Sequence, residues 1–119
     1  MLVNSESTCV PFTANDGCQI RELLHPKNEE VDLPFSLAVA EVEVGKSTYR
    51  HLLKQLEVYY IVAGTGEMHV GEEQCSVETG DVVVVPQSRV QWIENTGSQS
   101  LKFAAIVAPA WRAEDDERL

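Results

Sequence analysis

A chain of 119 residues is long enough to form one domain with its own core and too short to form two. Its net charge of −10 disfavours binding to nucleic acid or to an anionic membrane, because both require clustered Lys and Arg side chains. The sequence contains neither an apolar run of the ~18 to 20 residues that cross a membrane nor an export signal. Its three scattered cysteines agree with a reducing compartment, so we expect a cytoplasmic protein.

The first third of the chain predicts an arm, a strand and a loop. Residues 1–18 are polar and irregular, and we expect them to form an N-terminal arm or an edge strand. Residues 19–24 have the composition of a short strand, and residues 25–30 predict a loop because the residue before Pro26 is pushed out of the helical conformation. From Phe35 onward the apolar residues recur with a period of two, which predicts a strand.

The remainder of the chain alternates short β-rich stretches with turn-forming residues. The turns recur at the roughly eight- to twelve-residue spacing that is typical of a β-sandwich or barrel. The predicted strands cover residues 58–63, 67–70, 75–78, 82–85, 90–94 and 101–107. No segment of useful length has the period of a helix, so the fold class is predicted to be all-β.

Two glycine-framed segments carry the most specific pattern in the chain. The first, residues 45–64, is Gly45-x5-His51-x-Leu53-x3-Glu57-x6-Gly64. The second, residues 80–95, is Gly80-x5-Pro86-x-Ser88-x2-Gln91-x3-Asn95. Their spacing resembles the two-part signature of the cupin superfamily, G-x5-H-x-H-x3-4-E-x6-G followed by G-x5-P-x-G-x2-H-x3-N.

The resemblance implies a single-domain fold, the cupin-type double-stranded β-helix, also called a jelly-roll barrel. We expect the barrel to span residues 19–110, after the arm of residues 1–18. Residues 111–119 would follow as an acidic C-terminal tail, which we expect to be a solvated end.

The resemblance also implies a metal site with two altered positions. His51 and Glu57 occupy positions that bind metal in the family, whereas Leu53 and Gln91 stand where two further histidines are expected. The imidazole, the carboxylate and the amide oxygen of His51, Glu57 and Gln91 would hold a divalent transition metal such as Mn, Fe, Ni, Cu or Zn. Three ligands would leave open positions for water and substrate, whereas Leu53 cannot coordinate.

Side-chain alternation selects further residues for the barrel interior. Tyr49, His51 and Leu53 share one face of their predicted strand, and Glu57 and Tyr59 share one face of the next. We therefore predict that Tyr49, Leu53 and Tyr59 contact a small-molecule ligand, through hydrogen bonds from the phenols or through apolar packing.

Two classes of function stay open, and the sequence does not decide whether the protein is an enzyme. The leading hypothesis is a small cupin that binds a divalent metal and a small organic molecule, for example an oxygenase, isomerase or decarboxylase. The alternative is a non-catalytic, metal-free cupin that binds a small, partly apolar ligand, with His51, Glu57 and Gln91 as a hydrogen-bonded polar cluster. Leu53 favours the alternative, and metal-free acid–base catalysis by His51 and Glu57 is a third, weaker hypothesis.

The sequence also predicts self-association, and it predicts surface positions for two histidines outside the metal positions. The arm and the outward-facing apolar residues Leu52, Val58 and Trp92 favour a homodimer, because an uncovered apolar sheet face invites association. His25, in a proline-containing loop, and His69, which alternates with apolar neighbours, are predicted to lie on the surface.

Overall fold

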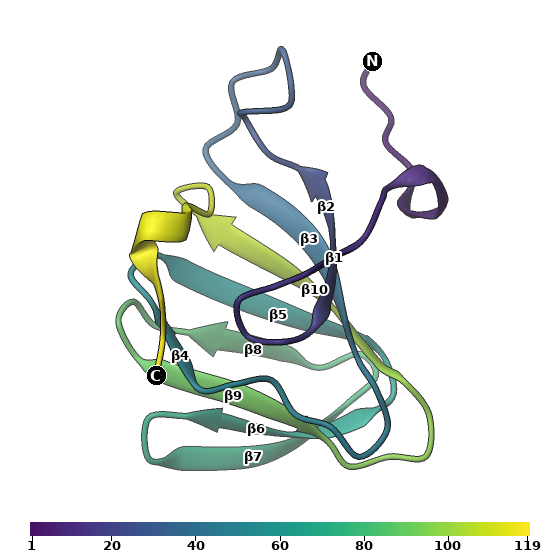
Figure 1. The fold of residues 1–119 in the computed structure, drawn as a ribbon, viewed down its shortest axis with the longest axis vertical. Coiled ribbons are helices and arrows are strands. Elements are labelled where there is room, and N and C mark those ends of the chain that lie inside the picture. Colours follow the sequence, from purple (N-terminus) through teal and green to yellow (C-terminus); the bar gives the residue numbers. More distant parts are fainter.

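The computed structural model describes residues 1–119 and has two antiparallel sheets (Figure 1). One sheet has six strands in the order β1 (Phe12–Thr13), β2 (Gln19–Leu24), β3 (Ser36–Val42), β10 (Leu101–Ala108), β5 (Leu56–Ala63) and β8 (Val82–Val85). The other has five, in the order β11 (Asp116–Arg118), β4 (His51–Leu53), β9 (Val90–Asn95), β6 (Thr65–Val70) and β7 (Glu73–Glu78). Two 3-10 turns, η1 (Glu6–Thr8) and η2 (Ala113–Asp115), complete the structure. The predicted all-β jelly-roll barrel is confirmed.

The strands form where the sequence alternates apolar and polar residues, and their inward side chains make the core between the sheets. Strand β5 shows the pattern clearly: Glu57, Tyr59 and Ile61 are buried, whereas Leu56 and Tyr60 are exposed. The largest inward side chains are almost inaccessible to solvent, and they are Tyr59, Phe103, Leu53, Ile61, Ile93, Leu101, Gln91 and Val85. None of the helices is long and apolar enough to cross a membrane.

The acidic C-terminal tail differs from the solvated end that we expected. Its residues Asp116–Arg118 form β11, which pairs with β4 so that Asp116 lies opposite Leu53. Two further backbone bonds, Lys54 N to Asp115 O and Leu119 N to Arg50 O, extend the contact. The physical reason is that β4 would otherwise be an edge strand with unpaired N–H and C=O groups. Figure 1 shows this segment running down alongside β4.

The N-terminal arm is also attached to the barrel. Strand β1 pairs with β2 through Phe12 and Ile20, and the backbone oxygen of Asp16 accepts a hydrogen bond of 2.6 Å from Tyr49 N. The loop after β1 therefore folds back across the front of the six-stranded sheet, as Figure 1 shows. Both chain ends thus close the same end of the barrel interior, which brings residues of the arm and the tail to one site.

The apolar residues that we singled out for a homodimer do not share one face. Leu52 and Trp92 belong to the five-stranded sheet and Val58 to the six-stranded sheet, and all three are half-buried. Six exposed apolar side chains share instead the outer face of the six-stranded sheet, and they are Leu56, Tyr60, Val62, Val82, Val84 and Ile106. The homodimer stays a prediction.

Gly64 and Gly80 have similar positive φ angles but differ in the space available for a side chain, so substitutions at the two positions distinguish backbone strain from steric overlap. Gly64 (φ +92°) and Gly80 (φ +95°) both occupy the left-handed region, but a Cβ at Gly64 would lie 2.9 Å from Ser100 O, whereas one at Gly80 would meet nothing within 4 Å. We expect Gly80→Ala to lower the free energy of unfolding by about 1 kcal/mol and Gly64→Ala by roughly 3 kcal/mol. Urea titration of both variants tests this, and equal losses would contradict it.

Candidate functional site

A cavity of about 430 Å³ lies between the arm, the inner face of the six-stranded sheet and the C-terminal segment. Apolar side chains make most of its wall, and the largest of them are Phe12, Ile20, Leu53, Val107 and Trp111. The ionisable side chains that line it are Asp16, Glu22, His51, Glu57 and Asp116. No Lys or Arg is among its 17 lining residues, so the cavity is acidic as well as largely apolar.

His51 is held in a fixed orientation within this wall. It lies on β4, is 4% exposed, and its Nδ1 is 3.1 Å from Asp116 Oδ1. Asp116 is held in turn by Trp111, whose Nε1 donates to Oδ2 at 3.0 Å. Because a carboxylate accepts hydrogen bonds, this contact places the proton on Nδ1 and leaves Nε2 as the nitrogen available to the cavity. Nε2 is buried and has no hydrogen-bond partner.

Asp16 reaches the same nitrogen from the arm. Its Oδ2 lies 3.7 Å from His51 Nε2, which is too long for a hydrogen bond but close enough for attraction between charges. Its Oδ1 accepts hydrogen bonds from the backbone N (3.2 Å) and the Sγ (2.8 Å) of Cys18. These bonds orient the carboxylate of Asp16, so that its second oxygen remains beside His51.

Glu57, Gln91 and Tyr59 form a second polar group deeper in the barrel. Gln91 Nε2 donates to Glu57 Oε1 at 2.9 Å, and the hydroxyl of Tyr59 donates to Gln91 Oε1 at 2.5 Å. Both ends of the Gln91 amide are therefore engaged, and its side chain is fully buried. Glu57 lines the cavity, whereas Gln91 and Tyr59 lie behind it.

The structure thus brings together some of the residues that the sequence selected. His51, Leu53 and Glu57 line the cavity, and Gln91 and Tyr59 are in contact with Glu57 or with each other. The hydrogen-bonded cluster that we considered for His51, Glu57 and Gln91 forms only in part, since Gln91 donates to Glu57 and not to His51.

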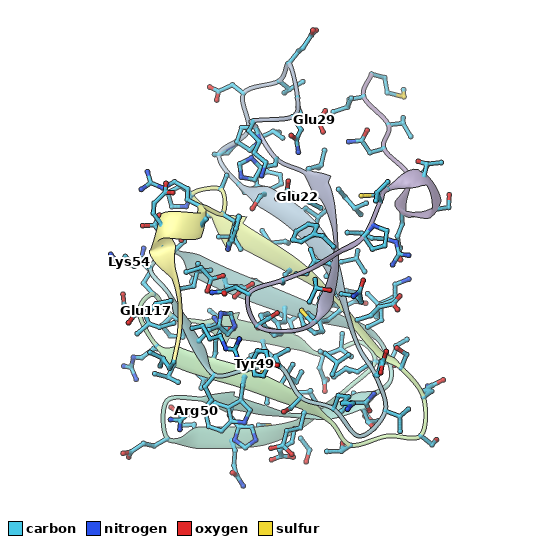
Figure 2. The ribbon with its side chains drawn as sticks, in the orientation of Figure 1. Glu22, Glu29, Tyr49, Arg50, Lys54 and Glu117 are labelled. Carbon is cyan, nitrogen blue, oxygen red and sulfur yellow. The ribbon has the colours of Figure 1, made fainter.

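Tyr49 does not line the cavity. It is 47% exposed on the segment before β4, where Figure 2 labels it, and the Arg118 guanidinium lies 3.5 Å from its ring centroid. The two remaining histidines also differ from the surface positions that we expected. His25 is buried and lies 2.7 Å from Trp111 O, and half-buried His69 stacks on Trp92 with ring centroids 4.2 Å apart.

Sequence reasoning missed three residues of the site, Asp16, Trp111 and Asp116. All three lie outside the glycine-framed segments, in the predicted arm and tail. The one signal available was the cluster of carboxylates near the C-terminus, but its pairing with β4 is a long-range contact that no local pattern reports.

The environment shifts the pKa values of three groups in the site. Burial raises the pKa of Glu57 to about 7, although the charge of His51 and the hydrogen bond from Gln91 oppose this. For His51, burial lowers the pKa, but the hydrogen bond with Asp116 and the nearby charges of Asp16, Asp116 and Glu57 together raise it above its ordinary value. For Asp116, burial raises the pKa, but hydrogen bonds from His51 and Trp111 outweigh it, so the pKa is lowered.

The residues at the family's four metal positions do not fit a resident ion of that kind. Leu53 has no donor atom, and both ends of the Gln91 amide are hydrogen-bonded within the barrel. Only His51 and Glu57 remain from that set, and nowhere in the chain do three His, Cys, Asp or Glu side chains gather in a geometry that holds a metal. Tight sites for transition metals in proteins use three or four such ligands.

The pKa shifts predict that stability falls as the pH rises from about 5 to about 8. Because the pKa of Glu57 rises from 4.5 to about 7 on folding, the folded state binds more protons in that interval. The raised pKa of His51 acts in the same direction. Its contribution to the free energy of unfolding is fully present below the ordinary pKa of 6.5 and is lost as the pH rises through the pKa of the folded state. The lowered pKa of Asp116 stabilises the folded state at pH values above the ordinary pKa of 3.8, and this stabilisation is lost only at lower pH.

Glu57→Gln removes the contribution of Glu57 to this dependence while keeping an acceptor for Gln91. We expect the free energy of unfolding of the variant to fall by about 2 to 3 kcal/mol less than that of the wild type over the same pH interval. Thermal and urea unfolding at several pH values measure this. A profile for Glu57→Gln that runs parallel to that of the wild type would contradict the burial of an ionisable carboxyl at this position.

Comparison with known proteins agrees with this architecture. The family model for the cupin domain matches residues 38–107. Uncharacterized protein MJ1618 of Methanocaldococcus jannaschii is 39% identical over 111 residues, which are 92% of this chain and 87% of that protein.

Two solved structures show the same fold. A predicted oxalate decarboxylase from Thermotoga maritima superimposes with a TM-score of 0.78 at 24% identity, covering 91% of this chain and 99% of that one. Oxalate decarboxylase from Bacillus subtilis, described with Mn(II) centres, has a TM-score of 0.78 at 24% identity, covering 89% of this chain and 29% of that one. Because the family model spans more than half of the chain, the protein belongs to the cupin domain family.

Proposed function

We propose that this cupin binds a small, partly apolar organic molecule in the cavity beside His51, without a resident metal. The observation that carries the proposal is the buried Nε2 of His51, which lines a cavity and has no hydrogen-bond partner. An unsatisfied buried polar atom costs about 1 to 3 kcal/mol, and a ligand with a complementary polar group would remove that cost.

The surrounding residues support such a role. Asp116 fixes the direction of the imidazole, and Trp111 fixes Asp116, so His51 is oriented before any ligand arrives. The volume of about 430 Å³ lies in the range of small-molecule sites. The apolar wall, to which Leu53 and Val107 contribute, would bury the carbon skeleton of the ligand and exclude water.

A divalent metal is the second candidate. His51 and Glu57 keep their family positions, and the carboxylate of Asp16 lies 3.7 Å from His51 Nε2, so an imidazole and a carboxylate are neighbours in the cavity. The Mn(II) centres of the similar Bacillus subtilis enzyme add support. The side chains of Leu53 and Gln91 make this candidate weaker than the metal-free one.

One pair of variants separates the two candidates. His51→Phe keeps an aromatic ring but removes Nε2, and His69→Phe is its matched control outside the cavity. In metal-free protein, we expect apolar fragments with one polar group to bind the wild type and His69→Phe alike, and His51→Phe about ten-fold more weakly, as the loss of one hydrogen bond of about 1.4 kcal/mol requires.

Nuclear magnetic resonance titration measures these affinities, and unfolding curves establish that each variant is folded. Elemental analysis after exposure to Mn, Fe, Ni, Cu and Zn tests the second candidate on the same samples. Near-stoichiometric metal in the wild type that is lost in His51→Phe would replace the metal-free proposal with the metal-dependent one.

We also propose that the exposed apolar face of the six-stranded sheet packs against a second copy of the chain. On this face Tyr60 lies opposite Val82, and Val58 lies opposite Val84, in the edge strand β8. The double substitution Val82→Glu and Val84→Glu would place charges in that contact, whereas Glu72→Lys changes an exposed residue of the β6–β7 turn.

We expect light scattering to give a dimer for the wild type and for Glu72→Lys, and a monomer for the double variant, because buried unpaired charges oppose association. A wild-type monomer at about 100 μM would exclude a stable dimer of the affinity that such interfaces reach.

A further inference from the structure

The charges around the cavity are unbalanced. Four carboxylate residues line it, and the one side chain that can carry a positive charge there is His51. Lys27 does not line the cavity but pairs with one of its carboxylates, Glu22, at 3.3 Å, and the Arg118 guanidinium lies over the ring of Tyr49. The cavity therefore has an excess of negative charge inside a largely apolar wall.

Each of the four carboxylates has at least one partner, and Glu22 and Asp116 have two side-chain partners each. Glu22 accepts from Lys27 and from Asn28 Nδ2 at 3.1 Å, and Asp116 accepts from His51 and Trp111. Glu57 accepts a hydrogen bond from Gln91 through one of its oxygens.

Asp16, like Glu57, has one oxygen without a hydrogen bond, and in Asp16 this oxygen, Oδ2, lies beside His51. The residue is 8% exposed, and its Oδ2 lies 3.7 Å from His51 Nε2. The buried Nε2 of His51, which has no hydrogen-bond partner, and Asp16 Oδ2, which accepts no hydrogen bond, thus lie side by side in the cavity wall. Burying such groups without compensation is costly, so the pair is suited to a group that donates to both.

We propose that the ligand of this cavity is an organic cation, a small apolar molecule with an ammonium group. The ammonium would donate a hydrogen bond to Asp16 Oδ2 and, at a pH where His51 is neutral with its proton on Nδ1 beside Asp116, a second one to the Nε2 lone pair. The hydrocarbon part would lie against the apolar wall formed by Phe12, Ile20 and Trp111. This inference rests on the proposed function and specifies the chemical class of its ligand.

The same charges disfavour oxalate as a ligand of the metal-free cavity. Oxalate is a dianion, and its recognition requires a cation or several donors to offset the carboxylates of the wall. No Lys or Arg side chain lines the cavity to supply such a charge. We therefore expect the metal-free cavity not to bind oxalate.

Three probes of similar shape test the inference: 2-phenylethylammonium, 2-phenylethanol and 3-phenylpropionate, titrated into the full-length protein with a chelator present. We expect the ammonium to bind at least about ten-fold more tightly than the alcohol, and the carboxylate more weakly than both. Asp16→Asn should reduce the affinity for the ammonium to that for the alcohol. Glu72→Gln, which alters an exposed carboxylate of the β6–β7 turn outside the cavity, should leave it unchanged.

The salt dependence of ligand binding to the wild type provides a second test that needs no substitution. Added salt should weaken binding of the ammonium and leave binding of the alcohol unchanged. If the alcohol or the carboxylate binds as tightly as the ammonium, the charge inference is wrong while the metal-free cavity remains a ligand site. If none of the three binds, or if oxalate binds only after Mn is added, both this inference and the proposed function are overturned.

Discussion

The arrangement of the site depends on the pairing of β11 with β4. This pairing places Asp116 opposite Leu53, and from there its carboxylate reaches His51 Nδ1 at 3.1 Å. Without it, β4 would be an exposed edge, His51 would lose its orienting partner, and Trp111 would lose the acceptor of its indole N–H. A short strand at the very end of the chain therefore decides which ring nitrogen of His51 faces the cavity.

Much of the barrel could be predicted from local pattern. The period of two and the glycine-framed turns located most strands, and parity placed Glu57, Tyr59 and Gln91 on inward faces, where the structure has them. The pairing of Asp16 and Asp116 with His51 could not be predicted, because arm and tail have no hydrophobic period and meet β4 only through long-range contacts.

The orientation of the Gln91 amide is another feature that sequence spacing does not report. Spacing showed that Gln91 occupies a metal position, but the hydroxyl of Tyr59 and the carboxylate of Glu57 determine where its oxygen and nitrogen point. The same barrel that holds Mn(II) in a similar enzyme therefore presents here an acidic, largely apolar cavity with one oriented imidazole. Shared architecture fixes the position of the cavity, whereas the side chains that line it determine what it can bind.

The most direct test of this account is a nitrogen-15 spectrum of the His51 ring in metal-free wild type and Asp116→Asn. The account predicts a hydrogen-bonded Nδ1 proton that is weakened in the variant, together with an Nε2 resonance that shifts when a cavity ligand is added. A neutral ring with its proton on Nε2, or a ring that responds neither to the variant nor to ligand, would contradict it.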